Sequence, residues 1–454
     1  MAITLDQKIS SSSDAFEAIA ADMQGNILST HGRDYVMHLF LRFKDRDSAR
    51  KFISEDVVPR IISAKQQKLD SQAFKDDASL KHKNFLTFSL SFQGYLFLGV
   101  PDLKTPGDRA FREGMKKRGD KLSDPKVNRW QREYRDDWHA LMVVGNASLK
   151  VLNQYINGFR AALRNATEEI HVEKGEGIRN EAGAHIEHFG YVDGISQPAM
   201  LTDKVDSGQI SREKWDPTVN LSMALTKDPG GETDDSCGSY LVFRKLEQNV
   251  KAFKEAERDL AEEIGVSVEY AGAQMMGRFR NGTPLVPMEP PSGLPTAKLN
   301  DFDYSTDMRS GSKCPFHSHV RKSNPRGSGG ASSEADKRHL FPRRGITYGF
   351  TRGEQDPEDG VGLLFMAYNS DISNQFEFMQ TSWCNAPGFP AGKSTGAPGV
   401  DPIIGQGTDP QGQNYFNKWG NDQSARRRGS ISGFVKMLGG EYFYTPSIST
   451  LRSL

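Results

Sequence analysis

An alternation of apolar, strand-like runs with amphipathic, helix-like runs occurs twice along this chain and most constrains its fold. Aromatic and β-branched side chains, which favour strands, are concentrated in residues 36–43, 85–100 and 138–145 of the first half. Apolar side chains recur at helical spacing in residues 47–64 and 149–165. Asp47 and Ser148 are the expected N-terminal caps of these helices, and Gly94 is the expected bend within the second strand.

The second half begins a similar series. Strands are expected at residues 239–243 and 362–368, and helices at 248–264 and 372–383. Strand, helix, strand, strand, helix, strand in two copies predicts an α+β fold of two ferredoxin-like domains with antiparallel sheets. The polar stretch 202–237 is the expected join, which places the domains at 1–215 and 216–454.

The composition argues for a globular protein that acts on small molecules. Lys plus Arg equals Asp plus Glu at 58 each, whereas nucleic acids and anionic membranes favour a basic excess. No run approaches the roughly 20 apolar residues needed to span a bilayer. The first residues lack a basic segment followed by an apolar run, so we expect a cytoplasmic location, with a mature secreted form left open.

Several common kinds of site have no sequence signature here. Cys237, Cys314 and Cys384 are far apart and form no CxxC, so neither a disulfide framework nor a zinc site is indicated. The chain has no GxSxG, GxxxxGK[ST] or HExxH motif, and no GxGxxG after a strand. Long loops rich in Gly, Pro and Ser are expected at 282–312, 323–333 and 386–420, and the second of these lies between two segments that could carry chemistry.

The first of these chemical segments is HIEHFGYVDGISQP, which contains Asp193. Gly190 and Gly194 bracket the acid and allow a tight turn that presents a short carboxylate to a ligand. A GxxDG pattern alone is weak evidence, because an Asp before a Gly is more often a turn residue than a catalyst.

The second segment, CPFHSHVRKSNPR, holds His317 and His319, followed by three cations. A histidine can ligate a transition metal through a neutral ring nitrogen while the other nitrogen donates to an acceptor. With no partner histidine at metal-site spacing, a solvated or core histidine is the commoner alternative. A haem needs only one protein ligand, because the porphyrin supplies four.

The third segment, FPRRGITYGF, contains Arg343 and Arg344 ahead of a strand-like run. Paired arginines commonly bind phosphates or carboxylates, or simply solvate a surface. In a closed apolar pocket, an arginine stays charged and can stabilise developing negative charge.

In this order, the three segments resemble the motifs of dye-decolourising peroxidases. The resemblance covers nearly the whole chain and includes DMQGNIL, DWHALMVVG, GSYLVFRKL, GLLFMAYNSDISNQFEFMQ and GVDPIIGQG. The length and the long insertions resemble the larger members of that family.

The resemblance implies a haem peroxidase that reduces hydrogen peroxide and oxidises bulky dyes or phenolic compounds through an oxoferryl intermediate. Haem b would be held mainly by the C-terminal half, with His319 as the iron ligand. Asp193 and Arg343 match the catalytic acid and arginine, and Arg344 is the fallback for the second role. Arg326, Leu363 and Phe365 are the further expected cofactor contacts, with Leu364 and Met366 in the core.

Roles beyond the haem contacts are also implied. Asp401 and Glu377 are the candidate acceptors for the second nitrogen of His319. Tyr348 and Trp383 are candidate surface sites for electron transfer from substrates too large to enter, and buried packing aromatics are an equally good reading of both.

Two other classes of function remain open from the sequence. A haem-binding protein without peroxidase activity, or one that releases the iron, would share the fold. An interaction module without haem is the further alternative, and the basic run Arg426, Arg427 and Arg428 could then meet a partner. An oligomer is compatible with all of these readings.

Overall fold

The computed structural model describes residues 3–77, 83–287, 294–330, 332–350, 355–391, 396–407, 409 and 412–454. Within them, the main sheet has nine strands in the order β4-β1-β3-β2-β13-β8-β10-β9, with β7 paired only to β8. Every neighbouring pair is antiparallel. The sheet is therefore continuous through both halves of the chain.

The N-terminal half supplies four strands of the main sheet: β1 (Tyr35–Phe43), β2 (Phe85–Ser91), β3 (Ala140–Asn146) and β4 (Thr167–Glu176). Its helices are α1 (Asp14–Ala20), α2 (Arg46–Lys51), α3 (Ala64–Asp76), α4 (Phe92–Leu98), α5 (Arg109–Glu113), α6 (Met115–Leu122), α7 (Leu149–Gly158) and α8 (Arg160–Ala166). The short strands β5 (Ile178–Arg179) and β6 (His185–Ile186) then pair with each other.

The C-terminal half supplies β7 (Thr226–Lys227), β8 (Cys237–Gln248), β9 (Ile346–Tyr348), β10 (Gly362–Asn369) and β13 (Val435–Thr445). Its helices are α9 (Asp203–Asp206), α10 (Val250–Ile264), α11 (Val268–Met276), α12 (His319–Ser323), α13 (Ser333–Lys337) and α14 (Ile448–Arg452). A separate hairpin joins β11 (Gln413–Phe416) and β12 (Ala425–Arg428).

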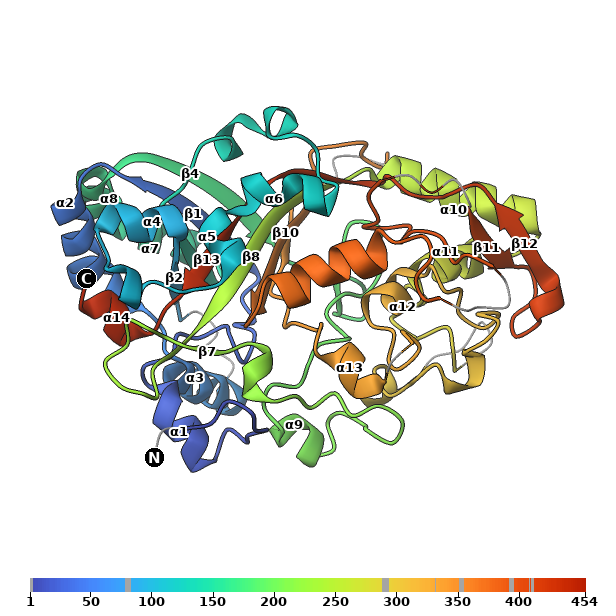
Figure 1. Cartoon of the computed structure of the whole chain (residues 1–454), viewed down its shortest axis with the longest axis horizontal. Helices are drawn as coiled ribbons and strands as arrows, with labels where there is room; N and C mark the ends of the chain where they lie inside the picture. The colour runs from blue at the N-terminus through green and yellow to red at the C-terminus, as the bar shows by residue number, and fades with distance from the viewer. Residues whose placement is uncertain are drawn as a thin grey trace.

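The two halves have the same strand order. Numbered within each half, both sets of four strands follow the order 4-1-3-2, with helical segments after the first and third strands. This repeated unit confirms the predicted α+β fold of two ferredoxin-like parts. The halves join where β2 pairs with β13, and both chain termini lie at the same end of the molecule (Figure 1).

The free edges of the sheet approach each other. The Thr347 hydroxyl of β9 donates to the carbonyl of Glu176 in β4. Gly175 packs so closely on Ile346 that a Cβ there would lie 2.3 Å from a methyl carbon. Since β4 and β9 are the outermost strands, the sheet curls into a barrel, and the Phe40 and Phe243 rings from the two halves pack in its core with centroids 4.8 Å apart.

The second predicted strand, 85–100, is wrong beyond residue 91. Helix α4 begins at Phe92 and is capped by the Ser91 hydroxyl, which accepts from the Gly94 N–H at 3.0 Å. A Cβ on Gly94 would lie 2.0 Å from the His139 carbonyl oxygen, so glycine permits helix and chain to touch rather than bend a strand. A short apolar run does not distinguish a strand from a buried helix.

The other predicted elements are present with local differences. The helix expected at 47–64 begins at Arg46 and is capped by Asp45 instead of Asp47. It then continues as a π-helical turn, Phe52–Val57. The helix expected at 372–383 consists of two π-helical turns, Ser373–Glu377 and Met379–Cys384. Among the helices described here, none is long and apolar enough to cross a membrane.

Candidate active site

A large cavity lies between the loop 187–198 and the C-terminal half. Its lining includes Asp193, His319, Arg343, Leu363 and Phe365, which come from four different segments of the sequence. The cavity volume is about 210 Å³. Measured in the same way, one water molecule needs about 10–15 Å³. It can therefore hold a ligand far larger than peroxide.

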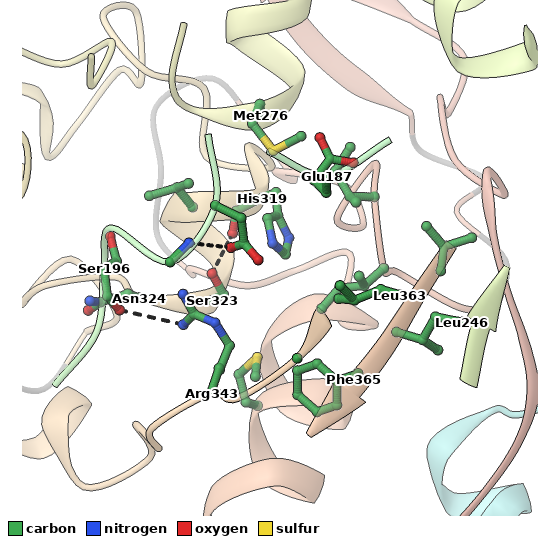
Figure 2. A pocket seen from close by; sticks show the side chains of 18 of the residues that line it. Glu187, Ser196, Leu246, Met276, His319, Ser323, Asn324, Arg343, Leu363 and Phe365 are labelled. Carbon is green, nitrogen blue, oxygen red and sulfur yellow. Dashed lines mark hydrogen bonds between the residues drawn. The ribbon is translucent and has the colours of Figure 1, made fainter. Parts of the chain in front are cut away.

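His319 is the first residue of α12, and its ring lines the cavity (Figure 2). The ring nitrogen Nδ1 lies 2.8 Å from the Asp401 carboxylate. Burial lowers the pKa of His319, but the nearby carboxylate raises it by more, so the pKa lies above its ordinary value. With Nδ1 donating to Asp401, Nε2 is left with a lone pair that suits a metal ion.

Asp401 is fully buried and held in place by the backbone. Its second oxygen accepts the N–H groups of Ile403 at 2.7 Å and Ile404 at 3.1 Å. Burial raises the pKa of Asp401, but His319 and these two amides together hold it below its ordinary value. Asp401 is thus the acceptor for His319.

Glu377, the other candidate acceptor, lies elsewhere. Its buried carboxylate pairs with Arg118, Lys121 and the Tyr442 hydroxyl. These partners leave Glu377 no role beside His319, so its prediction is wrong. The carboxylate stabilises the packing of α6 on the π-helical segment instead.

His317 is a core residue. It is 1% exposed, lies edge-on to the Tyr415 ring with centroids 4.5 Å apart, and does not line the cavity. Burial lowers its pKa to about 3. The turn that precedes α12 therefore points the two histidines in different directions, and of this pair only His319 faces the cavity.

Asp193 sits at the rim of the cavity on a glycine-bracketed turn. Gly190 and Gly194 have φ of +92° and +79°, a region that side chains rarely adopt. The Glu187 carboxylate fixes the turn, because it accepts the N–H groups of Phe189 at 2.8 Å and Tyr191 at 3.0 Å. Asp193 is itself exposed, and one of its oxygens accepts the Gly194 N–H at 2.6 Å.

Arg343 and Arg344 point in different directions. Arg343 lines the cavity, and its guanidinium reaches toward the Ser196 carbonyl at 3.5 Å (Figure 2). Its backbone N–H donates to Gln197 at 3.0 Å, which joins it to the loop that carries Asp193. Arg344 instead donates to the carbonyls of Asn26 and Ile27, away from the cavity.

One face of β10 lines the cavity and the other packs in the core, as predicted. Leu363 and Phe365 line the cavity and lie side by side on the strand (Figure 2). Leu364 and Met366, on the opposite face, are buried in the main core.

Arg326 does not line the cavity, which corrects the expected cofactor contact. Its guanidinium is buried between the Phe302 and Trp215 rings and donates to the carbonyls of Asn300 and Phe302. Arg321 is buried in the same manner against Asp307. Arg321 and Arg326 therefore hold loops together and do not line the cavity.

Tyr348 and Trp383 are buried, at 7% and 3% exposure, so their predicted surface position is wrong. Trp383 packs among aromatic rings, edge-on to His339 at 5.2 Å and stacked on Phe389 at 5.4 Å between centroids. His339 itself lines the cavity.

Among the acidic, basic and histidine side chains that line the cavity, four were not expected from the sequence: Glu187, Arg244, Arg278 and His339. Arg278 is buried, which lowers its pKa to about 10, and donates to Gly282, Leu299 and Ser196. Arg244 could have been identified from the sequence, because it is a charged residue within the apolar run of β8. Burying a charge is costly unless it is paired, so such a residue is a candidate for a functional role.

The same fold and motifs occur in known proteins. Residues 22–179 match the family model described as the DyP dimeric alpha+beta barrel domain. Residues 187–389 match the model of the Dyp-type peroxidase C-terminal part. Together the two models cover most of the chain.

Similar proteins extend the match over the full length. The chain is 41% identical to the multifunctional dye peroxidase DyP2 of an Amycolatopsis species over 95% of both chains. It is 29% identical to the dye-decolorizing peroxidase AauDyP1 of Auricularia auricula-judae, over 95% of this chain and 86% of the other.

Solved structures agree. The structure of the Amycolatopsis DyP2 matches with a TM-score of 0.93 at 40% identity and covers 100% of both chains. An Anabaena DyP-type peroxidase matches with a TM-score of 0.90 at 37% identity, over 99% of this chain and 98% of the other. The chain therefore belongs to the dye-decolourising peroxidase family and is a peroxidase.

Proposed function

We propose that the cofactor is haem b, that His319 binds its iron, and that Asp193 and Arg343 act on hydrogen peroxide. The observation that carries this proposal is the meeting of these three side chains at one cavity, although they are far apart in the sequence. Bulky dyes and phenolic compounds are the proposed reductants.

The cavity suits a large flat cofactor. Apolar side chains, among them Leu246, Leu363, Phe365 and Val435, make up much of its wall. A porphyrin buries mostly apolar surface and needs one axial ligand from the protein. His319 offers that ligand, since its other nitrogen is occupied by Asp401.

When bound, the haem would supply the iron redox centre that reduces peroxide and then accepts electrons from the reductant. Asp401 would orient the His319 ring and increase its electron donation. Reduction of peroxide to water also needs a proton carried from one oxygen to the other. An ionised Asp193 carboxylate at the cavity rim can accept and return that proton.

Arg343 would stabilise the negative charge that develops on the departing oxygen. Its guanidinium stays charged in an apolar pocket and presents several N–H donors.

A spectrum of the purified protein tests the proposal. We expect a Soret band that changes on adding one equivalent of peroxide and turnover of an anthraquinone dye. Asp193→Asn should keep the Soret band and lose the peroxide response. A Soret band without turnover would favour a non-catalytic or iron-releasing haem protein, and unchanged peroxide reactivity in Asp193→Asn would exclude proton transfer by Asp193.

The domain boundary between residues 215 and 216 and the cytoplasmic location remain predictions. Limited proteolysis and fractionation of cells that produce the protein would test them.

A further inference from the structure

A second arginine lies at the cavity, deep in the barrel wall. Arg244 is on β8, opposite Phe365 of β10 in the strand register, and it is among the lining residues. It is 4% exposed. Figure 2 shows its neighbour on the same face of β8, Leu246, close to Leu363.

The guanidinium of Arg244 is only partly paired. One terminal nitrogen donates to the Asp124 carboxylate, and the group lies over the Phe376 ring, 5.4 Å from its centroid. Its Nε and Nη1 atoms have no hydrogen-bond partner within the part of the chain described here, and neither does the second oxygen of Asp124.

Such a pattern is unusual for a buried cation. A buried donor without a partner destabilises a fold by about 1–3 kcal/mol, and nearly all buried polar groups are paired. Arg278, which lines the same cavity, gives both of its terminal nitrogens to carbonyl or hydroxyl oxygens. Arg244 is thus the buried arginine at this site that keeps donors for a ligand.

The chemistry of the free donors selects the ligand. The N–H groups of a guanidinium form strong, charge-assisted hydrogen bonds with carboxylate oxygens. The nearby buried acid Glu377 is already engaged by Arg118 and Lys121. Asp124 balances the charge of Arg244 but leaves the N–H groups of Nε and Nη1 without a partner within the described residues.

We propose that Arg244 is a carboxylate-binding residue of the cavity. The carboxylate belongs either to a haem propionate or to a small organic acid. The propionate form rests on the proposed function, because it requires haem in this cavity.

The test compares haem with its dimethyl ester, in which both propionates are blocked. Haem-free protein is titrated with each, and the Soret band gives the two affinities. The wild type should favour free haem. In Arg244→Met this preference should fall by about tenfold or more, as expected for loss of a charge-assisted hydrogen bond, with affinity for the ester retained.

Two further variants separate binding from folding. Arg244→Met alone leaves the Asp124 carboxylate buried without its partner, which could destabilise the fold. The double variant Arg244→Met with Asp124→Leu therefore removes both charges together. It should show the same loss of preference. Asp124→Asn is the matched control, because it keeps the free donors of Arg244 and should keep the preference for free haem.

A parallel titration with benzoate, measured by calorimetry, distinguishes a haem propionate from a small organic acid as the source of the carboxylate. If the double variant keeps the preference for free haem but no longer binds benzoate, the carboxylate that Arg244 binds belongs to a small organic acid. If the double variant changes neither quantity, the proposal is wrong. If wild-type protein takes up neither haem nor ester, the proposed function fails, while benzoate binding to the haem-free protein still tests Arg244.

Discussion

The Asp401 carboxylate lies 2.8 Å from Nδ1 of His319 and is itself fully buried and pinned by two backbone amides. A buried carboxylate on an axial histidine increases electron donation to the metal. In Asp401→Asn we expect a higher Fe(III)/Fe(II) midpoint potential and about 10–100-fold weaker retention of the metal centre. Potentiometric titration and the rate of haem loss measure these changes.

Glu377→Gln is the matched control for Asp401→Asn, since it makes the same chemical change in another buried carboxylate. It breaks the pairing with Arg118 and Lys121 and should lower the free energy of unfolding. The midpoint potential should not move. Equal shifts of potential in both variants would contradict a specific role for Asp401.

Substitution of Arg343 should affect activity, whereas substitution of the adjacent Arg344 should affect stability. Arg343 faces the cavity, so Arg343→Leu should slow the reaction with peroxide by about 10²–10³-fold and leave folding intact. Arg344→Leu should react normally but lose about 1–3 kcal/mol of stability for each stranded carbonyl of Asn26 and Ile27. Stopped-flow absorbance and denaturant unfolding distinguish the two, and the opposite pattern would move the proposed role to Arg344.

Trp383 should matter for dyes more than Tyr348 does. It connects cavity-lining His339 to the half-buried Phe389 through ring contacts. The Tyr348 hydroxyl has no partner in the described residues, and the Lys245 ammonium lies 5.0 Å from its ring centroid, which disfavours removal of an electron. Trp383→Phe should lose most dye turnover while its first reaction with peroxide stays normal.

Tyr348→Phe is the comparison for that prediction and should keep its dye turnover. Both variants are assayed with a bulky anthraquinone dye and with a small phenol. Loss of dye turnover in Tyr348→Phe alone would reverse the assignment.

The fold was predictable because its strands are long apolar runs and its helices have clear caps. Ser148 caps α7 as expected, since a hydroxyl before an apolar periodic run is a local signal. The helix at Phe92 was missed because its aromatic residues also suit a strand and because the contact between Gly94 and His139 is a tertiary one.

The site was predictable only in part. The motifs around Asp193 and His319 are local, and the resemblance to a known family connected them. The choice between Asp401 and Glu377 depends on distances across the fold, which the sequence does not contain. Arg326, which the resemblance implied as a cofactor contact, does not line the cavity, because the motif that contains it does not specify the direction of its side chain.

The buried histidine His38 should make stability depend on pH. It is 0% exposed, neither ring nitrogen has a partner in the described part of the chain, and burial lowers its pKa to about 4. The unfolded chain takes up this proton near pH 6.5, so the stabilisation from neutral His38 is complete above that pH and is lost as the pH falls toward 4. The loss is on the order of 3 kcal/mol.

His38→Met should remove that part of the pH dependence. Urea unfolding at a series of pH values between 7 and 4 measures the free energy of unfolding of both proteins. Buried His317, whose pKa burial lowers to about 3, contributes a similar pH dependence in both proteins. We therefore expect the slope of the free energy of unfolding against pH to decrease by the equivalent of up to one bound proton, and not to vanish. Equal slopes in the two proteins would mean that His38 is protonated, or reaches water, in the folded state.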